Sequence, residues 1–220
     1  ANTLSLHDAL PILIDEGDRM IDEDNIDGVK AIIKTTLKDR QIMIFSATIS
    51  LKVVEIAKTL MKDSEVIKVG DKSQVNPNIE HMYFVVERRD KLTLLRKLIS
   101  ATKPEKAIIF INKSDEVEIT TSKLSYHGLK VEGIHGSSDK RNRKKAIEDF
   151  NAGKIQLLVA SDLAARGLDI AGVSHIFNLD IPENSKDYLH RVGRTARMGE
   201  RGFALSITEE RELEDRKSVV

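Results

Sequence analysis

Beyond residue 79 the chain repeatedly alternates a short apolar run with a longer segment whose apolar residues recur at helical spacing. The apolar runs predict buried strands over residues 81–86, 107–110, 130–134, 156–159, 175–179 and 203–207. The segments between them predict helices over residues 90–100, 114–126, 139–151 and 185–192. Such alternation is typical of a parallel sheet with helices on both faces and right-handed crossovers. We therefore expect an α/β fold whose ligands bind at the carboxyl ends of the strands.

The first 70 residues predict a shorter unit of the same kind. The expected elements are strands at 12–14, 42–45 and 65–69, a helix between 24 and 37, and a helix beyond the capping residue Ser50. The polar stretch at 70–78, which contains Gly, Ser, Asn and Pro, predicts a linker. The expected units are therefore residues 12–69 and residues 79–212.

Composition excludes several classes of function. Lys and Arg together number 35, as do Asp and Glu, so the zero net charge argues against a histone-like polyanion binder but allows a local basic groove. The chain has no cysteine, which excludes disulfides and thiolate metal sites and fits a reducing, cytoplasmic setting. Its apolar runs are too short to span a membrane. Without Trp, an extensive aromatic platform for stacked bases is not expected.

Acidic residues directly follow the first apolar run, in the sequence DEGD at 15–18. Carboxylates at the end of a buried strand are costly unless a cation meets them. A phosphate-bound Mg²⁺ would be such a cation, with Asp15 holding it and Glu16 polarising a water for in-line attack. The alternative is a helix N-terminus that carries acids. Ser46 and Thr48 follow the second run, where small hydroxyl residues usually act as caps.

The stretch at 161–169, with sequence SDLAARGLD, follows the apolar run at 156–159. It places a hydroxyl, two acids, an arginine and a glycine in one turn-rich segment. Ser161 and the backbone near Gly167 could contact RNA phosphate, and Asp169 could accept a hydrogen bond from a ribose hydroxyl. The alternative is a capped connection with a chance Arg–Asp pair.

The stretch at 190–197, with sequence HRVGRTAR, sets three arginines three residues apart. A fixed guanidinium can stabilise the charge that spreads over a γ-phosphate during transfer, which is the role of an arginine finger. The alternatives are a patch that binds RNA phosphate and a solvated basic turn. The flanking residues Tyr188 and Leu189 argue for a structured segment and against the turn.

Gly136 follows the apolar run at 130–134, and a basic stretch comes next. Arg143 shares a helical face with the apolar residues Ile147 and Phe150, so it is expected to point inward at the ligand-binding end. The lysines that follow Arg143 are expected to face solvent.

Taken together, these stretches resemble the motifs of DEAD-box RNA helicases of superfamily 2. The matching stretches are IDEGD, SAT, IIF, HG with its downstream Arg, LVASDLAARGLDI, FNLDIP and HRVGRTAR, in the family's order and spacing, over about residues 12–212. The pair LVASDLAARGLDI and HRVGRTAR is highly specific. The family implies two RecA-like domains that close on ATP and single-stranded RNA. The resemblance thus implies a RecA-like parallel sheet with helices on both faces, preceded by a truncated RecA-like domain.

The resemblance also implies roles by position. For nucleotide chemistry, the matches are Asp15 and Glu16 to the acids of Mg²⁺ binding and hydrolysis, Asp15 acting on the metal through water, Asp169 to the ribose contact, and Arg194 and Arg197 to the arginine fingers. For coupling, they are Asp18, Ser46 and Thr48 to the relay between hydrolysis and domain closure, and His190 to the interdomain link with SAT. For RNA backbone contacts, they are Gly136, Arg143, Ser161 and Gly167, while Phe110 matches the motif that begins the RNA face of the second domain. Such contacts read backbone shape and 2′-hydroxyls rather than base edges.

Four departures from the family pattern limit these implications. Gly17 stands where Ala is usual, which predicts a mild effect, Lys140 stands where Gln is frequent, and Ala196 where Gly is usual. The fourth is that the 220 residues contain no G-x-x-x-x-G-K-[ST] phosphate loop, without which nothing cradles the β- and γ-phosphates.

The sequence therefore predicts the carboxyl part of an ATP-dependent RNA helicase that is inactive by itself. The alternative is a non-catalytic RNA-binding module. A remnant first domain would also leave open, apolar strand edges. We further expect a monomer that does not associate with membranes, with non-native residues at 1–11 and 213–220.

Overall fold

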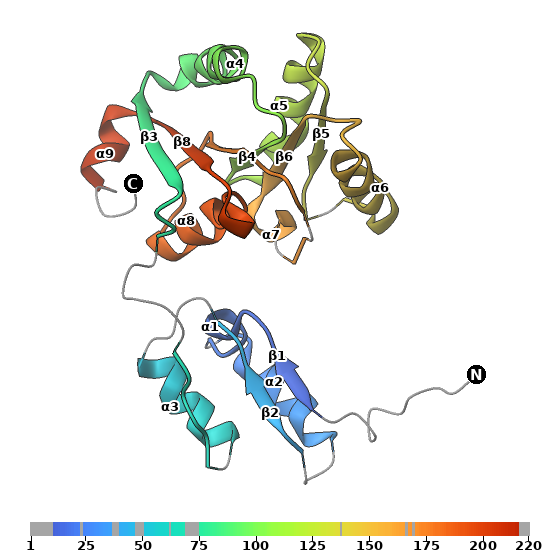
Figure 1. The fold of residues 1–220 in the computed structure, drawn as a ribbon, viewed down its shortest axis with the longest axis vertical. Coiled ribbons are helices and arrows are strands. Elements are labelled where there is room, and N and C mark those ends of the chain that lie inside the picture. The colour runs from blue at the N-terminus through green and yellow to red at the C-terminus, as the bar shows by residue number, and fades with distance from the viewer. Residues whose placement is uncertain are drawn as a thin grey trace. The chain divides into compact units, whose positions relative to one another are not determined.

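The computed structural model describes residues 11–22, 24–36, 40–46, 51–61, 63–68, 75–136, 138–165, 167–168 and 170–215. The chain divides into two compact units, one within residues 1–70 and the other within residues 71–220. Each unit has its own parallel sheet (Figure 1). No helix in these described segments is both long enough and apolar enough to cross a membrane.

The first unit is built on two parallel strands, β1 (Ile12–Ile14) and β2 (Ile42–Ile44). Its helices are α1 (Gly17–Met20), α2 (Ile26–Lys34) and α3 (Leu51–Leu60). The third strand predicted at 65–69 is wrong, because residues 64–68 form no strand and the side chains of 65–68 are exposed. An alternating pattern forms a strand only where a neighbour supplies ladder hydrogen bonds, and no described strand of this unit pairs there.

Large apolar side chains remain exposed in the first unit. Leu13, Ile32 and Phe45 expose 59%, 61% and 53% of their surface. A two-stranded sheet has two open edges and cannot cover such residues by itself. The described part of this unit therefore has the open, apolar strands that the sequence predicts.

The second unit contains a six-stranded, fully parallel sheet in the order β3-β8-β7-β4-β6-β5. Its strands are β3 (Ile79–Val85), β4 (Ala107–Ile111), β5 (Val131–Ile134), β6 (Leu157–Ser161), β7 (His175–Asn178) and β8 (Gly202–Thr208). Its helices are the 3-10 turns η2 (Arg88–Asp90) and η3 (Arg197–Gly199), and α4 (Lys91–Thr102), α5 (Ser114–Tyr126), α6 (Lys140–Asn151), α7 (Asp162–Ala165), α8 (Ser185–Val192) and α9 (Glu210–Asp215). The predicted α/β class, a parallel sheet with helices on both faces, is confirmed.

Alternate residues of each strand pack on opposite faces of this sheet. On β4, Ile109 and Ile111 join the core formed with α4 and α5. Ile108 and Phe110 join the core formed with α6 and α7 on the other face. Because every residue of β4 is buried, this central strand reads as a continuous apolar run rather than an alternating one.

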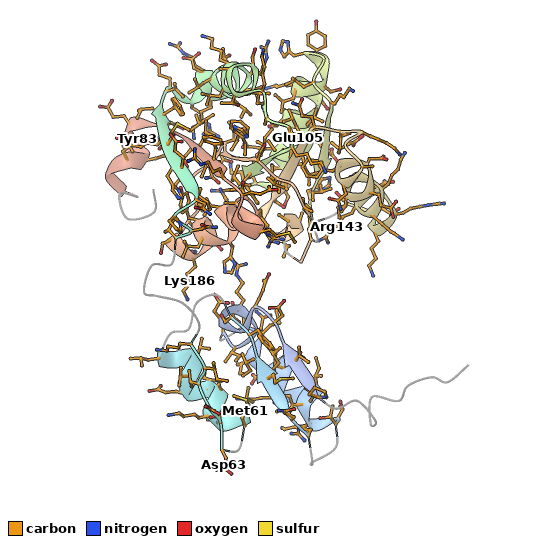
Figure 2. The ribbon with its side chains drawn as sticks, viewed as in Figure 1. Met61, Asp63, Tyr83, Glu105, Arg143 and Lys186 are labelled. Carbon is orange, nitrogen blue, oxygen red and sulfur yellow. The ribbon has the colours of Figure 1, made fainter. Side chains whose placement is uncertain are left out.

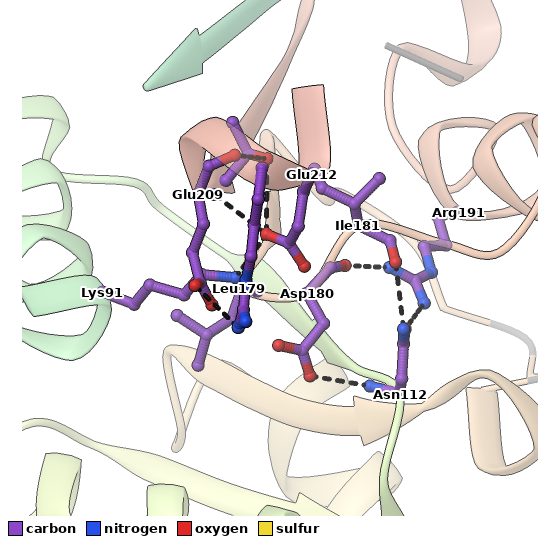
Figure 3. A network of polar contacts seen from close by, with 10 residues as sticks. Lys91, Asn112, Leu179, Asp180, Ile181, Arg191, Glu209 and Glu212 are labelled. Carbon is purple, nitrogen blue, oxygen red and sulfur yellow. Dashed lines mark hydrogen bonds and ion pairs between the residues drawn. The ribbon is translucent and has the colours of Figure 1, made fainter. Parts of the chain in front are cut away.

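The C-terminal helix α9 is joined to the rest of the second unit by a partly buried ion pair (Figure 3). Lys91 Nζ lies 3.0 Å from Glu212 Oε2 and 3.4 Å from the carbonyl oxygen of Leu179. The same carboxylate oxygen accepts from the Glu209 amide at 2.9 Å and from Thr208 Oγ1 at 3.3 Å. Burial alone would raise the pKa of Glu212, but these hydrogen bonds and the Lys91 charge outweigh burial and lower the pKa.

We expect Glu212→Gln to reduce the free energy of unfolding of the second unit by about 1–2 kcal/mol at pH 7, because hydrogen bonds to a charged group become bonds to a neutral one. A carboxyl whose pKa is lowered by folding stabilises the protein above its unfolded pKa, and this contribution is lost as the pH falls through the folded pKa. The difference between wild type and Glu212→Gln should therefore shrink below about pH 4.3. Urea unfolding at several pH values measures it.

The matched control is Glu148→Gln. Glu148 pairs with Lys144 at 3.8 Å, but the two side chains are 64% and 79% exposed. Such surface pairs contribute about 0–1 kcal/mol, so this change should be close to neutral. Equal effects of the two substitutions, or an effect of Glu212→Gln that does not vary with pH, would contradict the role of the buried pair.

Candidate functional site

The acidic stretch of the first unit forms a sharp turn between β1 and α1. Asp15 is exposed, and its Oδ1 accepts a hydrogen bond of 2.8 Å from the Glu16 amide. Glu16 has φ 51° and ψ 47°, the left-handed conformation that non-glycine residues rarely adopt. Such outliers concentrate at functional sites, where the surrounding structure enforces them.

The carboxylates at this turn suit Mg²⁺ rather than a metal that is caged by protein. Among the described residues, no three His, Cys, Asp or Glu side chains converge on one point. Mg²⁺ is usually bound through one or two carboxylates, with phosphate oxygens and waters completing its octahedron. The exposed Asp15 carboxylate fits that pattern.

Asp18 and Ser46 lie next to each other in the first unit, although 28 residues separate them. Ser46 Oγ donates to Asp18 Oδ1 at 2.9 Å, and the Asp18 amide lies 3.2 Å from the same Oγ. Two of the three predicted relay residues, Asp18 and Ser46, are thus in direct contact. Gly17 permits the approach, because a Cβ at this position would collide with the Ile44 methyl and lie 3.3 Å from the Phe45 carbonyl oxygen. The usual Ala would require the Ile44 side chain to shift, so Gly17 contributes close packing against β2.

In the second unit, Arg191 on α8 is almost fully buried, with 1% of its surface exposed. Its Nε and Nη2 bind both carboxylate oxygens of Asp162, at 2.7 and 2.6 Å. Nη2 also donates to Asn112 Oδ1, and Nη1 to the Asp180 carbonyl, both at 2.6 Å (Figure 3). The guanidinium lies over the Phe110 ring, 5.1 Å from its centroid. A bidentate, charge-assisted pair of this kind fixes both direction and distance.

The polar groups around Arg191 form hydrogen bonds with one another and with nearby backbone. Asn178 and Ser206 are 0% exposed, and Asn178 Nδ2 donates to Ser206 Oγ at 3.1 Å. The backbone amide of Asn112 donates to Asp180 Oδ2 at 3.0 Å, and its side-chain Nδ2 donates to the Ile181 carbonyl oxygen at 2.9 Å. Buried polar groups that are fully paired specify one arrangement, because an unpaired group would be costly. The carboxyl ends of β4, β6 and β7 are thereby joined to α8.

Helix α8 is also fixed at its start and on its inner face. Asn184 caps the helix by accepting from the Asp187 amide at 2.9 Å. Tyr188 Oη lies 2.6 Å from His81 Nδ1 on β3. Burial raises the pKa of Tyr188 to about 12, although its hydrogen bond with Ser206 opposes the rise, and burial lowers the pKa of His81. At neutral pH a protonated phenol therefore lies beside a neutral imidazole.

The loop that follows α8 carries Arg194 and Arg197. Arg194 is half-buried, and its Nη1 lies 3.4 Å from the Leu168 carbonyl oxygen. Arg197 is exposed, with its Nε 3.2 Å from the Gly193 carbonyl oxygen. Ala196 has φ 52°, which explains why a glycine is usual at this position. The loop, which leads into β8, presents these two guanidiniums near the amino ends of β7 and β8, since Thr195 Oγ1 donates to the carbonyl oxygen of Val173 just before β7.

The residues predicted to contact RNA come together at the carboxyl ends of β5 and β6. Ile134, at the end of β5, pairs with Ala160, so Gly136 and Ser161 follow adjacent strand ends. A Cβ at Gly136 would lie 3.4 Å from Leu163 Cδ2 on α7. Arg143 projects from α6 (Figure 2), and its Nη2 donates to the carbonyl oxygen of Ala164, also on α7, at 2.9 Å.

Two details of this group bear on its chemistry. Ser161 is 2% exposed, and within the described segments its Oγ has no hydrogen-bond partner. Gly167 has φ 63°, which favours glycine and permits a close backbone approach. Backbone amides, hydroxyls and guanidiniums are the groups that proteins use against phosphate.

The remaining residues singled out in the sequence are placed as follows. Thr48 and Asp169 lie outside the described residues. His190 is half-buried on α8, and its link to the first unit stays a prediction. Phe110 is 1% exposed and packs beneath Arg191, so its ring is part of the core and not of an exposed face. Lys140 begins α6 and is exposed.

Sequence reasoning did not assign a role to the partners of Arg191. These partners are Asp162, Asn112 and Asn178, whose Oδ1 accepts from Arg191 Nη1 at 3.4 Å. They are far apart in the chain and match no single pattern. The available signal was Asn178, a polar residue that ends the apolar stretch HIFN, since a buried amide needs a partner.

Comparison with known proteins agrees with this geometry. Residues 90–199 match the family model "Helicase conserved C-terminal domain", and residues 2–56 match "DEAD/DEAH box helicase". The DEAD-box ATP-dependent RNA helicase CshA of Geobacillus kaustophilus is 37% identical over 211 residues, which are 96% of this chain and 45% of that protein. CshA of Bacillus subtilis is 36% identical over 210 residues, 96% of this chain and 42% of that protein. The chain thus spans less than half the length of these relatives.

Solved structures lead to the same family. Yeast (S. cerevisiae) Dbp5 L327V bound to RNA and ADP BeF3 has a TM-score of 0.88 and 27% identity, over 97% of this chain and 57% of that one. A DEAD box protein from Methanococcus jannaschii has a TM-score of 0.63 and 31% identity, over 99% of this chain and 58% of that one. Motifs, fold, family models and relatives agree, and the chain belongs to the DEAD-box ATP-dependent RNA helicase family.

Proposed function

We propose that this chain is part of an ATP-dependent RNA helicase, a protein that hydrolyses ATP when RNA is bound and opens short RNA duplexes. The observation that carries the proposal is the Arg191 network. It joins Asp162, which follows the RNA-binding candidate Ser161, to the helix that leads into Arg194 and Arg197. The Arg191–Asp162 pair therefore connects the loop proposed to bind phosphate with the strand end proposed to bind RNA.

In this proposal both units contribute side chains that act on the nucleotide. Asp15 would hold Mg²⁺ through water, and the metal would neutralise charge on the transferred phosphoryl group. Glu16 orients the attacking water, while Arg194 and Arg197 stabilise the charge that develops on the γ-phosphate. Asp169 accepts a hydrogen bond from the ribose hydroxyl.

Coupling to RNA would depend on two further groups of residues. Gly136, Arg143, Ser161 and the backbone at Gly167 bind phosphates of a single strand, with little preference for sequence. Asp18, Ser46, Thr48 and His190 transmit the state of the nucleotide to domain closure. Reading of the backbone rather than the base edges suits an enzyme that acts on many RNAs.

The proposal treats the chain as inactive by itself, because the 220 residues hold no phosphate loop. It also places the protein in the cytoplasm as a monomer. The second candidate, a non-catalytic RNA-binding module, is favoured by the same missing loop and applies to the chain as it stands.

The test is RNA-stimulated ATP hydrolysis by two proteins. One is this chain alone; the other, called the completed protein below, is this chain joined behind the phosphate-loop part of a relative's first domain. We expect turnover only by the completed protein, and stimulation by single-stranded RNA. Turnover by the chain alone would overturn the requirement for the loop. A folded completed protein that binds RNA without hydrolysing ATP would favour the binding module.

A further inference from the structure

The loop that carries Arg194 and Arg197 has an unusual backbone. Ala196 and Met198 have φ values of 52° and 57°, and Gly199 has 81°. Two non-glycine residues in the left-handed region within three positions are uncommon, and such a conformation persists only where neighbouring contacts enforce it. The surroundings of this loop should therefore contain the groups that hold it.

The base of the loop is fixed by packing. Thr195 is 2% exposed, and its Oγ1 donates to the Val173 carbonyl oxygen at 2.6 Å. A Cβ on Gly202 would lie 2.6 Å from Thr195 Cγ2 and 2.9 Å from the Ala196 amide nitrogen, so β8 starts in direct contact with the loop. These contacts anchor Thr195 but do not hold the tip of the loop, where the Met198 side chain is fully exposed.

The far side of the loop is held by the residues that lead into β3. Asn76 Nδ2 donates to the Ala196 carbonyl oxygen at 2.9 Å across 120 positions of sequence. Asn78 Nδ2 lies 3.4 Å from the Gly199 carbonyl oxygen, and the Asn78 carbonyl accepts from the Gly202 amide at 3.0 Å. The two ends of the left-handed turn are thus bound by side chains from one short segment.

The Asn76 amide uses both of its ends. While Nδ2 binds Ala196, Oδ1 accepts from the Asn78 amide at 3.0 Å, which closes a tight turn before β3. The second bond keeps the side chain from rotating away from the loop. Asn76 lies in the polar stretch at 70–78 that the sequence predicts to connect the two units.

We propose that Asn76 is a positioning residue for the arginine loop: its bond to the Ala196 carbonyl sets the turn that presents Arg194 and Arg197, so that the end of the connecting segment controls where the guanidiniums lie. The proposal rests on the proposed function for the phosphate-reading role of those arginines. The bond itself is independent of that role, and so is its effect on the loop.

Two substitutions separate this role from local turn formation. Asn76→Asp keeps the acceptor for the Asn78 amide but cannot donate, and it places an oxygen against the Ala196 carbonyl. Asn76→Ala removes both bonds. Asn142→Ala is the matched control, because Asn142 is exposed on α6.

The first measurement is amide hydrogen exchange in the chain as it stands. The Glu200 amide donates to the Arg197 carbonyl at 3.2 Å and reports on the turn. We expect its exchange to be about fivefold faster in both Asn76 variants, the factor that one ordinary hydrogen bond represents, and unchanged in Asn142→Ala. Wild-type exchange in Asn76→Asp would overturn the proposal, because Asn76 would then only close its own turn.

The second measurement is ATP hydrolysis by the completed protein. Asn76→Asp is expected to lower kcat by about tenfold, since small misplacements of catalytic groups are costly, with the half-saturating RNA concentration and the urea unfolding midpoint unchanged. An unchanged kcat would overturn the positioning role. If the completed protein has no ATPase activity at all, the proposed function fails, whereas the exchange measurement still decides whether Asn76 holds the loop.

Discussion

Replacing Arg194 by alanine is expected to lower the kcat of ATP hydrolysis by the completed protein by about 10³-fold, the smaller end of the range for arginine fingers. Arg194 is half-buried, and its Nη1 lies a long 3.4 Å from the Leu168 carbonyl oxygen. A large loss of kcat in a protein that stays folded is the result expected of an arginine finger. The measurement is steady-state ATPase activity at saturating RNA, with circular dichroism to establish folding.

Arg194→Lys and Arg201→Ala complete this experiment. Lysine keeps the charge but not the planar fork, so it should restore only part of the activity. Arg201 is exposed in the same segment and should tolerate alanine with kcat unchanged. If Arg194→Ala lowers kcat no more than Arg201→Ala does, the arginine-finger assignment is wrong, and the loop serves RNA phosphate instead.

Replacing Arg191 by alanine is expected to lower the free energy of unfolding of the second unit by about 3–5 kcal/mol, the usual cost of breaking a buried ion pair. The guanidinium is 1% exposed and binds Asp162 through two short bonds. Its loss also leaves Asn112 Oδ1 and the Asp180 carbonyl without their donor. Urea unfolding, followed by circular dichroism, measures the change.

Two controls give this prediction its specificity. Arg141→Ala, at an exposed position on α6, should change stability by less than about 0.5 kcal/mol. The double variant Arg191→Met with Asp162→Asn removes both charges, and should be less destabilising than Arg191→Ala because no carboxylate is left without its partner. A loss below about 1 kcal/mol in Arg191→Ala would show that the network adds little.

Apolar runs and spacings predicted most of the fold of the second unit. The run predicted as a strand at 107–110 is β4 (Ala107–Ile111), and the helix predicted at 114–126 is α5 (Ser114–Tyr126). Both follow from local physics, since burial on two faces demands a continuous apolar run and burial on one face demands helical spacing. Where a neighbour was needed, as at 65–69, the same reasoning was wrong.

The candidate site divides in the same way. Its residue types follow from chemistry that is visible in the sequence, as with the acids at 15–18 and the arginines at 191, 194 and 197. Which of these residues is structural and which faces a ligand does not follow from the sequence. Arg191 and Arg194 are three residues apart with the same side chain, yet one is buried in a structural network and the other lies half-exposed in a loop.

The α/β class and the positions of the strands could be predicted from the sequence, because both depend on the hydrophobic period. Which polar residues meet depends on the tertiary structure. Arg191 donates hydrogen bonds to Asn112, Asp162 and Asp180, and Asn76 donates one to Ala196. These pairs are separated by 11 to 120 positions of sequence. Such pairings depend on strand order and on the path of loops, and no local pattern encodes either of them.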